Sequence, residues 1–103
     1  MIKAEIFSSD GKITGFSIKG HGGTAPRGQD IYCAGVSTLS QAAYMCITDH
    51  LKREINGSQA DGKLMLKLKT PPDELTEAVF QTMLIGLIEI EKLEPKALKV
   101  IVN

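Results

Sequence analysis

The chain has 103 residues, of which 43% are hydrophobic and 23% are charged. This length and composition are typical of one globular domain, residues 1–103, and exclude an intrinsically disordered polypeptide. Its 12 basic and 12 acidic residues give a net charge of zero, which argues against a general nucleic-acid binder but not against a local basic patch. No apolar run approaches the roughly 18 residues of a membrane span. The start turns polar too early for a signal peptide, so we expect a cytoplasmic protein with no membrane partner.

The first 20 residues predict a β-hairpin. Residues 2–7 alternate between apolar and polar side chains, which is the pattern of a half-buried strand. Asp10 and Gly11 form a hairpin turn signal, and residues 13–20 follow as a second strand with Gly15 as a bulge. Residues 20–28 are predicted to form a loop.

A long helix is predicted from about residue 31 to residue 55, with Asp30 as its N-cap and Asn56 and Gly57 at its end. Its apolar residues recur at helical spacing: Tyr32, Val36, Leu39, Ala43, Cys46 and Ile47.

Residues 62–70 alternate again and predict a third strand. Thr70 is the predicted cap of a second helix, with two prolines in its first turn, that continues to about residue 94. Residues 96–103 predict the last strand. The order ββαβαβ favours a two-layer α/β (α+β) fold with a four-stranded sheet and two helices.

The two cysteines are expected to stay reduced. Cys33 and Cys46 lie 13 positions apart in the same predicted helix, or about 20 Å along its axis. A disulfide requires Cα atoms within about 7 Å. Cys46, inside the apolar stripe, is expected to be a structural core residue.

Cys33 occupies the first turn of the predicted helix, where the unpaired N–H groups stabilise a thiolate. His21 follows the second strand, whose end is a plausible neighbour of the helix start. Together the two residues are the minimum set for an activated thiol nucleophile. The alternatives remain open at this point: Cys33 as a small buried hydrophobe and His21 as an ordinary surface residue.

Other chemistries fit the sequence less well. His21 and Cys33 are too few to complete a metal site, and the chain has no CxxC or HxxxH pair, so we expect no metal. The glycines of residues 20–28 match neither a P-loop nor a dinucleotide fingerprint. We therefore expect no cofactor.

The stretch GH, a Gly-rich loop and G-x-D-I-x-C-A-x-V-S, residues 20–37, resembles the ribosomal-processing cysteine protease family, called Prp. The length and element order agree, so the likeness spans the whole chain. It implies an endopeptidase that removes the N-terminal extension of the large-subunit ribosomal protein L twenty-seven, cutting after an aromatic residue. It also implies a homodimer.

The resemblance assigns Cys33 as the nucleophile and His21 as its base. Gly20, Asp30 and Ser37 are the supporting motif residues. The chain departs from the family pattern at Tyr32, where an aliphatic residue is usual.

The chain also departs from the family pattern at Gly35, where a second alanine is usual. Neither departure changes His21 or Cys33.

The loop that carries Gly22, Gly23, Arg27 and Gly28 is expected to admit an extended peptide.

Two other functions fit the sequence less well than a protease. One is a non-catalytic ribosome- or RNA-associated module that binds RNA on its sheet; zero net charge and the lack of an aromatic pair on any strand count against it. We expect no nucleic acid to be required. The other is a thiol redox protein, which is disfavoured because Cys33 has no second cysteine within reach to resolve an oxidised intermediate.

The second helix carries more apolar surface than one core face hides. Its predicted sheet-facing stripe contains Leu75, Val79, Phe80, Met83, Leu87 and Ile90. Leu84, Ile85 and Ile88 fall outside that stripe, and an exposed apolar patch on a small protein is suited to a two-fold interface. These three residues are the predicted homodimer interface; the alternative is that another segment of the chain covers them.

Overall fold

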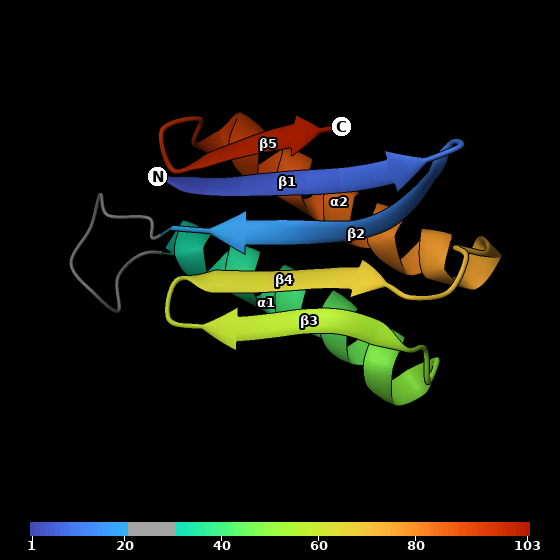
Figure 1. Ribbon diagram of the computed structural model, residues 1–103. Helices are drawn as coiled ribbons and strands as arrows, with labels where there is room; N and C mark the ends of the chain where they lie inside the picture. Colours follow the sequence, from blue (N-terminus) through green and yellow to red (C-terminus); the bar gives the residue numbers. More distant parts are fainter. Residues whose placement is uncertain (21–30) are drawn as a thin grey trace.

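The computed structural model describes residues 1–20 and 31–103, which form a sheet covered on one face by two helices (Figure 1). In chain order the elements are β1 (Ile2–Ser9), β2 (Lys12–Lys19), α1 (Ile31–Met45), a π-helical turn η1 (Cys46–His50), β3 (Ile55–Ala60), β4 (Lys63–Leu68), α2 (Glu74–Leu93) and β5 (Leu98–Val102). The sheet order is β3-β4-β2-β1-β5. No helix in the described part of the chain is long and apolar enough to cross a membrane.

The opening hairpin confirms the turn prediction. Asp10 and Gly11 both have positive φ, 53° and 83°, which is the geometry of a type I′ turn. The β1–β2 register skips Thr14 beside Gly15, so the strand bulges where predicted. A Cβ at Gly15 would clash with the Leu66 carbonyl oxygen of β4, and glycine therefore allows the two strands to approach.

The prediction of four strands is wrong because the sheet has a fifth strand, β3, which begins where the first helix was predicted to end. The α-helix ends at Met45, and the π-helical turn carries the chain only to His50. Asn56 and Gly57 then lie within β3 rather than at a helix end. A Cβ on Gly57 would clash with the Tyr44 hydroxyl, so glycine is required there for packing and not for a turn.

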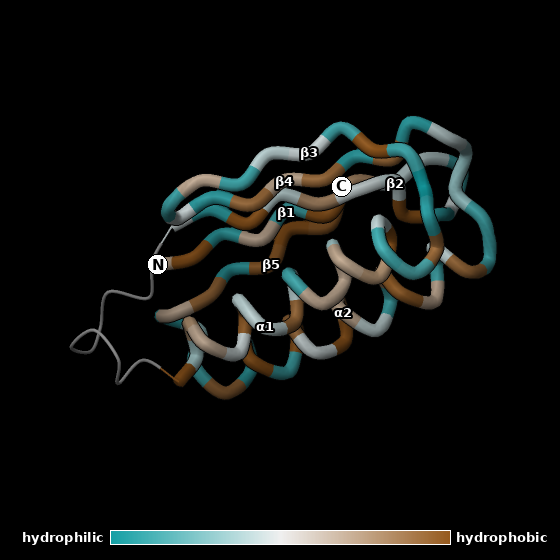
Figure 2. The backbone as a smooth tube through the Cα atoms, turned by 90° about the horizontal axis from the view of Figure 1, so that it is seen from below, coloured by the Kyte–Doolittle hydropathy of each residue, from teal (hydrophilic) through white to brown (hydrophobic). Residues whose placement is uncertain are grey.

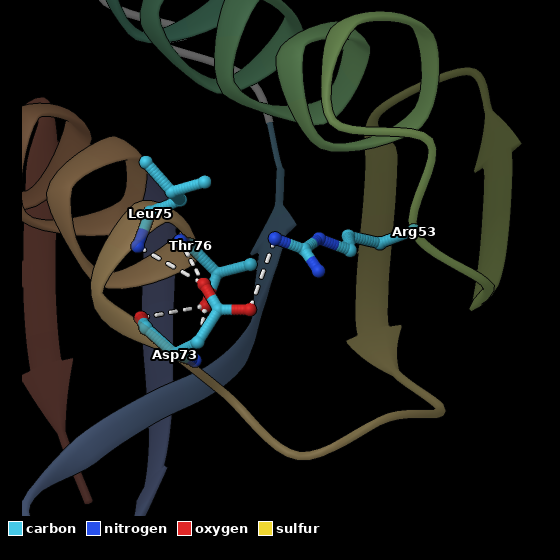
Figure 3. Close-up of polar contacts among 4 residues, drawn as sticks. All are labelled: Arg53, Asp73, Leu75 and Thr76. Atoms are coloured by element: carbon cyan, nitrogen blue, oxygen red, sulfur yellow. Dashed lines mark hydrogen bonds and ion pairs between the residues drawn. The ribbon is translucent and has the colours of Figure 1, made fainter.

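The start of the second helix also differs from the prediction. Asp73, not Thr70, is the N-cap, and both prolines precede the helix. One oxygen of the Asp73 carboxylate accepts hydrogen bonds from the Leu75 and Thr76 N–H groups, both at 3.0 Å, and the other pairs with Arg53 at 3.0 Å (Figure 3). The Thr76 hydroxyl accepts from the Asp73 N–H, which completes a capping box.

The core lies between the sheet and the two helices (Figure 2). Phe16 of β2 meets Phe80 of α2 edge to face, with ring centroids 6.1 Å apart. The other large, fully buried side chains come from both layers: Ile6, Ile47, Leu66, Met83, Leu87 and Leu98.

The face that α2 buries corrects the predicted interface. Leu84 is only 8% exposed and belongs to the core, and Ile88 packs against that core. Ile85 is 61% exposed, as predicted, whereas Leu75 is 59% exposed although it was assigned to the buried stripe. The buried residues of α2 begin at Thr76 and include Leu84, so Leu75 in the first turn faces outward.

The α1–α2 contact explains the glycine that departs from the family pattern. A Cβ added to Gly35 would lie 3.1 Å from Cδ1 of Ile90, and one added to Gly86 would lie 2.7 Å from Cδ1 of Leu39. These two glycines let the helices approach closely. A glycine in a helix lowers its stability by roughly 1 kcal/mol relative to alanine. The close packing of α1 against α2 offsets this loss.

Candidate active site

A cavity of about 300 Å³ opens at the end of the sheet where α1 begins. Apolar side chains from three strands and one helix turn form its floor: Ile2, Ile18, Val36 and Leu64, all buried. Its rim is polar and comes from α1 and from the β3–β4 hairpin. A water-shielded floor under a polar rim can hold an apolar side chain while the rim orients the backbone of a ligand.

Cys33 lines this cavity from the first turn of α1 and is partly buried against the core. The described part of α1 begins at Ile31, two residues before Cys33, and N–H groups in the first turn of a helix have no acceptor within that helix. A thiol in this position has donors beside it that can stabilise a thiolate or an oxyanion. Partial exposure leaves it accessible to an incoming ligand.

Ser37 lies one turn further along α1 and also lines the cavity. Its side chain is exposed, and its carbonyl oxygen accepts a 3.3 Å hydrogen bond from the Ser40 hydroxyl. The buried Ser40 hydroxyl also donates to the Val36 carbonyl at 2.8 Å. Cys33, Ser37 and Gln41 therefore form the helical wall of the cavity in successive turns.

Gly20 closes the cavity at the end of β2. Its φ of 102° is accessible to glycine, and a Cβ there would clash with the Met1 carbonyl oxygen. Its N–H donates a 2.9 Å hydrogen bond to the carbonyl of Gly62 in the β3–β4 turn. The start of the chain, the end of β2 and the β3–β4 hairpin are thereby held together at the cavity.

The structure brings Cys33, Ser37 and Gly20 to the same cavity. The other predicted site residues, His21, Gly22, Gly23, Arg27, Gly28 and Asp30, lie outside the described residues. Three rim residues, Gln41, Asp61 and Lys63, were not predicted as site residues. Asp61 and Lys63 flank Gly62, and the Asp-Gly pair at residues 61–62 is a hairpin turn signal like the pair at residues 10–11. The turn is present in the structure, where Gly62 has a φ of 71°.

Cys46 lies at the far end of the same helix, at the start of the π-helical turn. It is partly buried and lines a second, apolar cavity of about 250 Å³ between α1 and α2, beside Leu39, Val79 and Met83. Both cysteines lie in the described part of the chain, and neither forms a disulfide. Cys46 was predicted to be a core residue, but its side chain is only partly buried because one side of it faces this cavity.

A partly exposed cysteine near the start of a helix, at the wall of a cavity with an apolar floor, is suited to act as a nucleophile on a bound ligand. The family model described as "Cysteine protease Prp" matches residues 1–99. The chain belongs to this family, and it is a cysteine protease. The reading as a non-catalytic module is thereby overturned.

Solved structures share the whole fold. The essential ribosomal processing protease Prp from S. aureus, in complex with a covalently linked product peptide, matches with a TM-score of 0.92 and 24% identity over 100% of both chains. The same protease with a substrate peptide matches at 0.86 and 24%, again over 100% of both chains. SMU.848 from Streptococcus mutans matches at 0.80 and 25%, over 99% of this chain and 93% of that one. No curated protein matches the chain.

Proposed function

We propose that the chain is an endopeptidase that removes the N-terminal extension of ribosomal protein L twenty-seven in the cytoplasm. The observation that carries this proposal is the position of Cys33, in the first turn of α1 and at the wall of an open cavity. The relatives from S. aureus hold a substrate peptide and a covalently linked product peptide, which supports a peptide as the ligand.

The apolar floor suits the side chain that precedes the cut. Ile2, Ile18, Val36 and Leu64 offer a dry surface, and about 300 Å³ is enough for one aromatic ring with part of its backbone. Burial of an aromatic side chain releases a large apolar area from water and orients the following peptide bond. We therefore assign the residue before the cut to this floor.

The dyad of the proposal is Cys33 with His21, which follows Gly20 in the sequence. The Cys33 thiolate attacks the scissile carbonyl carbon, and N–H groups of the first turn of α1 stabilise the oxyanion. His21 gives its proton to the leaving amine, and the shortened protein leaves while the extension stays bound as a thioester. A water molecule, deprotonated by His21, then attacks the thioester and restores the thiol.

The supporting residues have smaller roles in this proposal. Asp30 caps the helix that carries the nucleophile, and Ser37 lines the cavity one turn below it. Arg27 and the loop glycines Gly22, Gly23 and Gly28 contact the extended peptide.

The proposal includes a homodimer. Of the three predicted interface residues, Ile85 is the one that stays exposed and can contribute to an intermolecular contact, because the chain itself covers Leu84 and much of Ile88. A two-fold axis near Ile85 would pair this side chain with its own copy.

The experiment that tests the proposed function uses synthetic peptides that span the junction of the extension. Mass spectrometry should detect one cut, after the aromatic residue, and a transient mass increase on the Cys33 peptide equal to the acyl fragment. The matched control peptide carries alanine in place of the aromatic residue and should be cut at least tenfold more slowly (~1.4 kcal/mol). Equal cleavage of both peptides would show that the aromatic residue does not bind to the cavity floor. Cleavage without acylation of Cys33 would contradict the thioester mechanism.

A further inference from the structure

The zero net charge conceals an uneven distribution between the two layers. The strands carry one glutamate, Glu5, and six lysines: Lys3, Lys12, Lys19, Lys63, Lys67 and Lys99. Helix α2 carries one lysine, Lys92, and four glutamates: Glu74, Glu77, Glu89 and Glu91. The sheet layer is therefore basic and the helical layer acidic, which produces a surface field that the net charge does not reveal.

The register of the sheet aligns four of these lysines. Lys63 pairs with Lys19, Lys19 with Lys3, and Lys3 with Lys99. We call this set the lysine row: Lys63, Lys19, Lys3 and Lys99. Neighbouring strands are about 4.8 Å apart, so the lysine row spans about 14 Å across four strands.

All four side chains leave the sheet on the face that the helices do not cover. The strand residues beside them, Ile2, Ile18, Leu64 and Leu98, are buried in the core, and successive side chains of a strand point to opposite faces. All members of the lysine row are exposed. Figure 1 looks onto this open face, and the row crosses it at the end where β1 begins and β2 ends.

Like charges directly opposite one another destabilise a sheet. The two ion pairs that the described residues form, Arg53–Asp73 and Lys92–Glu89, do not involve the lysine row. The carboxylates nearest to the row along the chain are Glu5, two residues from Lys3, and Asp61, two residues from Lys63 in the β3–β4 turn, and four lysines outnumber them. The row therefore concentrates positive charge that a polyanion would neutralise.

We propose that the lysine row binds the phosphate backbone of RNA without reading its sequence. Each lysine presents a point charge, and none of the four positions offers the arginine fork that recognises a carboxylate in bidentate fashion. The row also contains no aromatic side chain on which a base stacks. Both features favour phosphate contacts over an acidic peptide or base recognition.

Lys63 links this surface to the candidate active site, because it belongs to the lysine row and also lines the cavity of Cys33. RNA on the open face would hold the protease next to RNA-bound protein while the cavity stays accessible from the helical side. Cleavage of a free peptide does not depend on this contact. RNA binding by the lysine row therefore goes beyond the proposed function, and either one can fail while the other holds.

The test compares two variants with equal net charge. The row variant is Lys3→Gln, Lys19→Gln and Lys99→Gln, and the control variant is Lys52→Gln, Lys92→Gln and Lys96→Gln, at exposed positions outside the strands. Fluorescence anisotropy with a labelled RNA duplex is measured from about 50 to 200 mM salt. Each phosphate contact adds about 0.7–0.9 to the slope of log K against log salt, so the row variant should lose about 2–3 from the slope and at least tenfold in affinity. The control variant should lose no more than about threefold, the scale of its general change in charge.

Three outcomes would overturn the proposal: no salt-dependent binding by the unmodified protein, equal losses in both variants, or binding of poly-glutamate or a DNA duplex in preference to RNA. Thermal unfolding checks the fold, and the row variant should be at least as stable as the unmodified protein because the repulsion is relieved. If the row variant nevertheless unfolds, Lys3→Gln and Lys99→Gln alone decide the question, each with an expected slope loss of about 0.7–0.9. Peptide cleavage by the row variant should be unchanged.

Discussion

A partly buried cysteine lies near each end of α1, Cys33 at its start and Cys46 just after its last residue, and their surroundings differ. Cys33 lies near the start of α1, where N–H groups have no acceptor within the helix itself, and it lines a cavity with a polar rim. Cys46 lies 13 residues later, in a π-helical turn, and lines an apolar cavity against α2. The same side chain thus lies in a cavity with a polar rim near one end of the helix and in an apolar cavity near the other.

The largest expected effect comes from removing the thiol at the first end. Cys33→Ala should reduce peptide cleavage by about 10⁴-fold or more, because the acyl group then has no atom to which it can attach. Circular dichroism and thermal unfolding should show an intact fold, since the side chain lies at the edge of the core. If Cys33→Ala retained cleavage, the nucleophile would be elsewhere.

Removing the proposed base should slow two reactions together. His21→Ala should lower cleavage by about 10²–10⁴-fold. It should also slow iodoacetamide alkylation of Cys33 between about pH 6 and pH 8, where an imidazolium that favours the thiolate titrates. Alkylation of Cys46, measured in the same digest, provides the internal control. An unchanged Cys33 rate in this variant would show that the two residues are not coupled.

Gly20 connects the cavity to the sheet, and Gly11 at the opposite end of β2 is its matched control. Gly20→Ala should cost about 1–3 kcal/mol and reduce cleavage, because it combines a positive φ with a clash against the Met1 carbonyl. Gly11→Ala has the same backbone strain but no atom within 4 Å of the new Cβ. It should cost about 1 kcal/mol and leave cleavage unchanged. Denaturant unfolding and the peptide assay separate the two, and a loss of cleavage in both variants would contradict a local role for Gly20.

Neighbouring residues of α2 give a second matched pair. Leu84→Glu places a charge in the core and should cost about 3–5 kcal/mol, whereas Ile85→Glu, at an exposed position, should change stability by less than about 0.5 kcal/mol. Sedimentation of Ile85→Glu should give a monomer where the unmodified chain gives a dimer. A dimer of normal affinity in this variant would place the interface away from Ile85.

The smallest effect is expected at the second cysteine. Cys46→Ala should lose about 1 kcal/mol and keep full cleavage, because the side chain is only partly covered by the apolar cavity. Denaturant unfolding measures the loss, and the peptide assay measures the activity. If Cys46→Ala lost as much activity as Cys33→Ala, the prediction that only Cys33 is needed for cleavage would be wrong.

Local signals in the sequence predicted much of the fold and part of the site. The type I′ turn at Asp10 and Gly11, the bulge at Gly15 and the strand around Leu64 and Leu66 were all predicted correctly. Strand β3 was missed because it is an edge strand with mostly exposed, small residues and therefore lacks the alternation that marks a half-buried strand. Asn56 and Gly57 also suggest a turn when they are read without their neighbours.

The buried face of α2 shows a second limit. Helical periodicity restricts which residues share a face, but a helical wheel can be rotated by one position without breaking the pattern. In the structure the buried face of α2 includes Leu84, whereas Leu75 is exposed. The sheet and α1, which pack against α2, decide the extent of the buried face, and a helical wheel contains no information about them.

The sequence by itself determined the class of the fold, the position of Cys33 in a first helical turn and the family motif, because each depends on residues close together along the chain. The tertiary structure alone decided which residues from β1, β2, α1 and the β3–β4 hairpin enclose the cavity. It also decided that Lys63, Lys19, Lys3 and Lys99 lie side by side. Strand order and register set both arrangements, and these depend on how two layers bury their apolar faces against each other, a property of the whole chain and not of any one segment.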